Sequence, residues 1–175
     1  MQEGRSRRAA DCLATAAITV MLCAPPTFAA PVDGREAADR MPTRTLVAGA
    51  AARAAAKLRR SECREVLSDF RDGAGRRLSE ILDERGVSAG EFLARLVFVD
   101  GRGVPRCAGG KVAAGANFGT NFVGVCKQTF ARVQAEDPGL AANIVIHEML
   151  HSLGLGEDPP TSEQINRQVA KRCGP

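Results

Sequence analysis

The sequence contains only two histidines, His147 and His151, and they lie four residues apart with Glu148 directly after the first. Positions four apart stack on one face of a helix, so both imidazoles can reach a single ion. The residues around them, from Pro138 to about Leu153, are apolar nearly all round, which is typical of a helix buried in a core. Burying two imidazoles and a carboxylate is costly unless a partner satisfies them. We therefore expect a buried helix that carries a metal site.

Two histidines leave this site one protein ligand short, because catalytic zinc usually takes three protein ligands and a water. Gly154 can adopt a positive φ, end the helix and turn the chain back toward the imidazoles. That turn places Glu157 best as the third ligand. Asp158 and Glu163 remain open as alternatives.

The stretch His147-Glu148-x-x-His151-x-x-Gly154-x-x-Glu157 resembles the zincin metallopeptidases, and among them the metzincin pattern, which has a histidine or aspartate where Glu157 stands. The resemblance implies zinc ligands at His147, His151 and Glu157, with Glu148 as general base. It covers residues 147–157 only. No methionine follows Met149 to form a methionine turn, and no carboxylate beyond Glu163 could serve as the thermolysin-like ligand. We expect a compact zincin-like variant of neither main branch.

The resemblance implies a zinc-dependent peptidase, in which Glu148 takes a proton from water activated at the zinc. The sequence has no tyrosine and no third histidine to stabilise the resulting oxyanion. Zinc itself and the backbone N–H groups of residues 109–124 remain candidates for that role. The candidate side chains are those of Asn117, Asn121, Arg102 and Arg106. Two other functions stay open: a non-catalytic zinc-binding or interaction domain, and a metallohydrolase of a non-peptide amide.

The N-terminal residues have the layout of a secretory signal peptide. Arg5, Arg7 and Arg8 precede an apolar run over residues 12–24, and the small residues near Ala29 offer a cleavage site. The run is shorter than the roughly 20 residues that span a bilayer, so no stable membrane insertion is expected after cleavage. We predict a signal peptide at 1–29, a linker or short pro-segment at 30–55, and a domain at 56–175 that is secreted or periplasmic.

Beyond the predicted signal peptide the chain has four cysteines, an even number that suggests two disulfides in an exported protein. Three pairings are possible. We favour Cys107–Cys126, which closes a β-rich segment, and Cys63–Cys173, which ties the C-terminal helix to an early one. No C-x-x-C motif indicates a thioredoxin-like function.

Charge and aromatic content argue against nucleic-acid binding. The net charge is +4, basic and acidic residues are interspersed, and the chain has neither Trp nor Tyr to stack on bases. We expect a monomer whose partner is a peptide or protein substrate.

The residue patterns predict an α+β fold with a short, mostly antiparallel sheet and several helices. Strands are expected at 96–99, near 111–114 and at 122–126. Helices are expected around 58–72, 78–85, after Ser88, over 138–153 and over 162–172. Ser88 lies within a G-x-S-x-G sequence, but a capping box with Glu91 favours a helix N-cap there and not a nucleophile.

Overall fold

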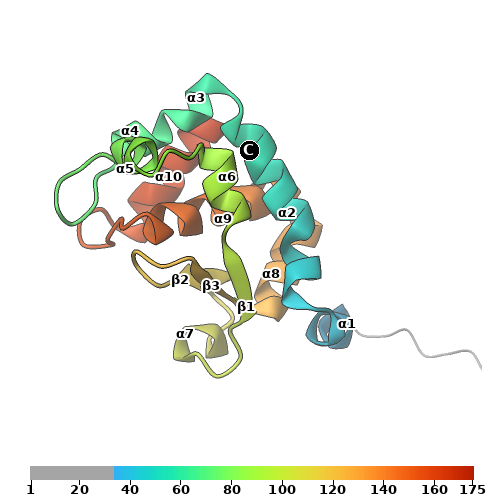
Figure 1. Cartoon of the computed structure of the whole chain (residues 1–175). Helices are drawn as coiled ribbons and strands as arrows, with labels where there is room; N and C mark the ends of the chain where they lie inside the picture. Colours follow the sequence, from blue (N-terminus) through green and yellow to red (C-terminus); the bar gives the residue numbers. More distant parts are fainter. Residues whose placement is uncertain (1–33) are drawn as a thin grey trace, which may run out of the picture. The chain divides into compact units, whose positions relative to one another are not determined.

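The computed structural model describes residues 34–175, with side chains from residue 37 onward, so the predicted signal peptide lies outside the described residues. The described part is α+β, with helices packed around a three-stranded sheet (Figure 1). No helix in this part is both long and apolar enough to cross a membrane. In chain order the elements are α1 (Gly34–Arg40), α2 (Thr43–Leu58), α3 (Ser61–Arg64), α4 (Val66–Asp69), α5 (Leu78–Glu84), α6 (Ala89–Ala94), β1 (Val97–Asp100), α7 (Pro105–Ala108), β2 (Ala114–Ala116), β3 (Phe122–Val125), α8 (Lys127–Glu136), α9 (Pro138–Ser152) and α10 (Ser162–Cys173).

The sheet is mixed, with strand order β1-β3-β2, so the expectation of a mostly antiparallel sheet was wrong. β1 pairs in parallel with β3 from Val97↔Phe122 to Asp100↔Val125, whereas β2 pairs with β3 antiparallel. A parallel pair needs a long crossover connection. Here the chain between β1 and β3 supplies it by passing through α7 and β2. In Figure 1, α7 lies across the sheet from α6 and α10.

Helix α2 is packed in the core although most of it lies within the predicted linker or pro-segment at 30–55, so the compact fold begins before residue 56. Its Val47, Ala50 and Ala54 are at most 1% exposed, and α2 packs against α9, α6 and β1. The segment is alanine-rich and has little apolar periodicity. Small side chains allow the close helix–helix packing that buries it.

Several predicted helix ends agree with the structure, because each is specified by local residues. Ser88 accepts a hydrogen bond from the Glu91 N–H at the start of α6, as a capping box requires. Thr161 does the same with Gln164 at the start of α10. The predicted helix near 58–72 is instead divided, with Leu58 ending α2 and the short helices α3 and α4 following.

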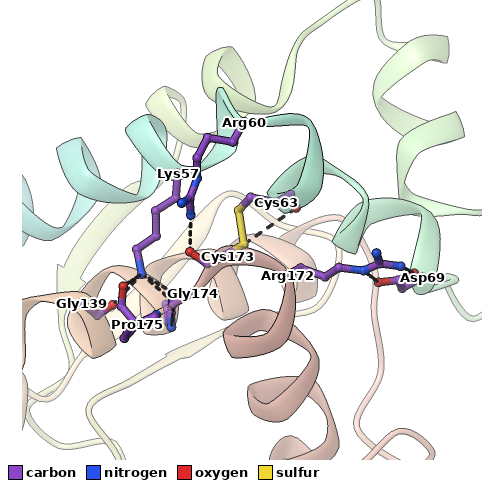
Figure 2. Close-up of a disulfide and its surroundings, with 10 residues drawn as sticks. Lys57, Arg60, Cys63, Asp69, Gly139, Arg172, Cys173, Gly174 and Pro175 are labelled. Carbon is purple, nitrogen blue, oxygen red and sulfur yellow. Dashed lines mark hydrogen bonds and ion pairs between the residues drawn. A yellow bond between two sulfur atoms is a disulfide. The ribbon is translucent and has the colours of Figure 1, made fainter.

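Both predicted disulfides are present. Cys107–Cys126 joins α7 to the residue after β3, and Cys63–Cys173 joins α3 to the end of α10. Figure 2 shows further contacts beside the second disulfide. Arg172 pairs with Asp69 of α4 at 2.7 Å, and the Lys57 ammonium donates to the Asn143 side chain and to the Gly174 carbonyl. These bonds fasten α10 against α2, α4 and α9. Disulfides are typical of proteins in oxidising compartments.

Candidate metal centre

Helix α9 carries the site, and local residues set both of its ends. Asp137 accepts a hydrogen bond from the Leu140 N–H, and Pro138 occupies the first turn. At the other end Gly154 has φ +108°, a left-handed conformation that suits glycine. Beyond it the Leu155 N–H returns to the Leu150 carbonyl at 3.1 Å. The chain therefore folds back beside the last turn of the helix, as the position of Gly154 predicts.

The two imidazoles are buried and face each other. His147 is 5% exposed and His151 is 3% exposed. Their Nε2 atoms lie 2.9 Å apart. The Nδ1 atom of His151 lies 2.7 Å from the Leu155 carbonyl oxygen, and that of His147 lies 2.8 Å from Oδ1 of Asn166 on α10. A carbonyl oxygen only accepts, so Nδ1 of His151 carries a proton, and in the neutral ring the Nε2 lone pair is directed at the site.

Glu157 is the carboxylate that the structure brings to the imidazoles. Its Oε1 lies 3.3 Å from Nε2 of His151 and 3.7 Å from Nε2 of His147. His147, His151 and Glu157 form a group whose ligand atoms lie close enough together to hold one metal ion. The alternative Glu163 instead pairs with Arg167, and Asp158 is exposed outside this group. Of the three candidates, Glu157 has the position of a third ligand.

The contacts of Glu157 with the histidines resemble salt bridges, but they need a protonated imidazole. Burial, and after it the neighbouring His151, lowers the pKa of His147 to about 4. His147 is therefore neutral near pH 7, and its Nε2 acceptor faces another imidazole nitrogen and a carboxylate oxygen. Acceptors at such distances repel each other unless a proton or a metal cation lies between them. The donor set, two imidazole nitrogens and one carboxylate oxygen, suits a divalent transition metal.

Glu148 points from the same helix to the edge of the sheet. The side chain is 5% exposed, and its Oε2 accepts a hydrogen bond from the Ala116 N–H of β2 at 2.6 Å. Burial raises the pKa of Glu148 to about 7, against the opposing effect of the Ala116 hydrogen bond. A carboxylate with a pKa in this range can accept and release a proton at neutral pH.

An open cavity of about 330 Å³ joins these groups, and its wall includes both histidines, Glu148 and Glu157. Larger cavities elsewhere contain neither histidine. The edge strand β2, Phe118 and Ser162 complete much of the wall. The Phe118 ring packs edge-on against His151, with centroids 5.2 Å apart. The Gly119 N–H donates to the His151 carbonyl at 3.0 Å, so the β2–β3 turn is fastened to the end of α9.

The four side chains proposed from sequence as oxyanion donors have separate positions. Arg106 lines the cavity, whereas Arg102, Asn117 and Asn121 are not part of its wall. Arg102 is held by Asp100 at 2.7 Å. Sequence reasoning missed Asn166, Phe118 and the Ala116 N–H, because these groups come from other elements and carry no motif of their own.

No protein-family model matches the sequence, and no curated protein or solved structure matches it. Fold and site together define an α+β protein with two disulfides and a group of two buried histidines and an exposed glutamate that could hold a metal ion.

Proposed function

We propose that this protein is an exported zinc-dependent peptidase of zincin-like type, with His147, His151 and Glu157 as zinc ligands and Glu148 as general base. One observation carries the proposal: the ligand group and a buried carboxylate of raised pKa line one cavity beside the edge strand β2. A zinc ion bound there would supply Lewis acidity, which polarises a carbonyl and acidifies water.

In the proposed reaction, Glu148 moves the proton. In the resting site it accepts from the Ala116 N–H. It would take a proton from the attacking water and later deliver that proton to the leaving amine. A pKa of about 7 suits both transfers at neutral pH, because the group gains and loses a proton with little cost.

The edge of β2 supports a peptide as substrate. The Cys126 N–H donates to the Ala113 carbonyl and the Asn117 N–H donates to the Phe122 carbonyl, so the backbone groups of these residues face β3. Because these directions alternate along a strand, the backbone N–H and C=O groups of Ala114 and Ala116 point to the outer edge of the sheet. An extended peptide can add to such an edge as a further strand. Its backbone would then lie along the cavity that contains Glu148.

Export is supported by the two disulfides and by the signal-like layout of the N-terminal sequence. The residues of that layout lie outside the described part. Mass spectrometry of the protein recovered from the medium or periplasm would test the expected cleavage after residue 29.

Glu148→Gln tests the proposal most simply. The variant keeps an acceptor for the Ala116 N–H but cannot take a proton, so it should bind zinc as the wild type does and lose hydrolysis of an unfolded protein substrate. Hydrolysis that survives in Glu148→Gln would show that the base is another group. A zinc-loaded wild type that cleaves no member of a broad peptide library would favour a non-catalytic zinc-binding domain.

A further inference from the structure

Arg106 is the cationic side chain in the wall of the cavity, and its guanidinium could bind a substrate there. Among the described residues it makes neither a hydrogen bond nor an ion pair. Arg102, four residues earlier in the same connection, differs in both respects, because it binds Asp100 and lies outside the cavity. The two arginines of this connection are therefore not equivalent.

The Arg106 side chain packs against Gly115, in the space that a side chain at this position would fill. A Cβ atom placed on Gly115 would lie 2.8 Å from Nη1 and 3.1 Å from Cδ of Arg106, so the guanidinium end lies directly over the middle of β2. The next residue, Ala116, donates its N–H to Glu148. Arg106 and Glu148 therefore approach the same short length of edge strand. The neighbouring disulfide Cys107–Cys126 fastens α7, which carries Arg106, to the end of β3.

Few side chains in this cavity can stabilise an oxyanion. The sequence has no tyrosine, and both histidines belong to the ligand group. The remaining side-chain donors in the cavity wall are Arg106 and the hydroxyl of Ser162. A charged donor binds a negative oxygen about twice as strongly as a neutral one, so the exposed guanidinium of Arg106 is the stronger candidate of the two.

We propose that Arg106 is a catalytic residue that donates hydrogen bonds to the carbonyl oxygen of the scissile amide as that oxygen becomes negative. The inference rests on the proposed peptidase function. As the water oxygen bonds to the carbonyl carbon, Glu148 accepts the water proton and the C=O π electrons move to the oxygen that Arg106 faces. The C–N bond then breaks as that electron pair returns, and the proton on Glu148 passes to the leaving nitrogen.

A kinetic comparison tests this role. The zinc-loaded protein is assayed on one peptide that the wild type cleaves, chosen without Asp or Glu and made with a free and with an amidated C-terminus. Arg106→Ala should lower kcat about 10²- to 10³-fold on both forms with little change in KM. Arg106→Lys should recover part of the loss. Gly115→Ala keeps the guanidinium but adds a methyl group where Arg106 packs, so it should displace Arg106 and also lower kcat.

Arg102→Ala is the matched control and should keep the wild-type kcat. Equal zinc content and thermal melting for all variants would exclude misfolding as the cause of a loss. If Arg106→Ala keeps its kcat, or only raises KM for the free-carboxylate peptide, then Arg106 is not an oxyanion donor, and in the second case it anchors the substrate's carboxylate. A wild type that cleaves nothing overturns the peptidase proposal together with this one.

Binding supplies a second measurement that does not depend on turnover. A phosphinic analogue of the same peptide carries a tetrahedral anionic centre in place of the amide. Arg106→Ala should weaken binding of this analogue by a factor comparable to the kcat loss. Binding of the parent peptide is measured in the inactive Glu148→Gln background, where the single variant and the double variant with Arg106→Ala should have equal affinity. Equal loss for both ligands would assign Arg106 to ground-state binding and overturn the inference.

Discussion

Nε2 of His147 lies 2.9 Å from Nε2 of His151, while Nδ1 of each ring lies within hydrogen-bonding distance of an oxygen on another segment. The outer oxygens fix the ring orientations, and the inner nitrogens point toward Glu157. Without a proton or a metal cation between them, these acceptor atoms would repel one another. This relationship between two residues is the basis of the metal-site account.

Asn166 should matter for metal affinity although it is not a ligand. Its Oδ1 lies 2.8 Å from Nδ1 of His147 and orients that ring. Partners of this kind typically contribute a factor of about 10 to 100 in affinity. Asn166→Ala should weaken zinc binding by that amount in a competition titration with a chromophoric chelator. Gln168→Ala on the same helix is the control, because Gln168 bonds to Asp69 instead. Equal affinities for the two variants would contradict the role of Asn166.

The two disulfides should differ in their effects. Cys63–Cys173 closes a loop of sequence separation 110, whereas Cys107–Cys126 closes one of 19. Removing a native disulfide commonly costs roughly 2–5 kcal/mol, and the loop-entropy model assigns the larger loss to the longer loop. Paired Cys→Ser variants should therefore both lower the unfolding free energy in urea, with the larger loss for Cys63 and Cys173. The opposite order would show that local packing outweighs chain entropy here.

Stability should depend on pH through Asp69. Hydrogen bonding from Arg172 holds the pKa of Asp69 below its usual value. Because the folded pKa is depressed, this contribution is present above the unfolded pKa and is lost as pH falls through the folded pKa. Asp69→Asn should lower the melting temperature at neutral pH and approach the wild type only as the pH falls through the depressed folded pKa.

Asp83→Asn is the control for that series, since Asp83 is exposed on α5 and is not one of the two acidic partners of Arg172, Glu65 and Asp69. Melting curves recorded from about pH 6 to about pH 2 give the comparison. A constant difference between wild type and Asp69→Asn over the whole range would show that the ion pair does not couple to folding.

The parts of the fold that follow from the sequence are those with local causes. Ser88, Thr161 and the Asp137-Pro138 pair each specify a helix start through side chains within one turn. Gly154 likewise indicated the turn that returns Glu157 to the histidines. Both disulfides were also predicted, because four cysteines in a chain of this kind leave few pairings.

The rest depends on contacts between distant segments. The register Val97↔Phe122 joins two strands across a crossover, and no residue near either strand specifies a parallel pairing. Helix α2 is buried because α9 packs against it, although its alanine-rich sequence has little amphipathic pattern. Helix α8 was not predicted at all. In the site, the bond from Asn166 to His147 joins two helices that only the folded chain brings together.

Metal content tests the central claim most directly. The protein is saturated with zinc, dialysed against metal-free buffer and analysed for bound metal by elemental mass spectrometry. The wild type and Glu148→Gln should retain one zinc per chain, and Asp158→Ala should match them. His147→Ala and His151→Ala should retain almost no zinc. Glu157→Gln should retain an intermediate amount. A folded wild type that holds no stoichiometric metal, or a His151→Ala variant that still holds one, would contradict the account.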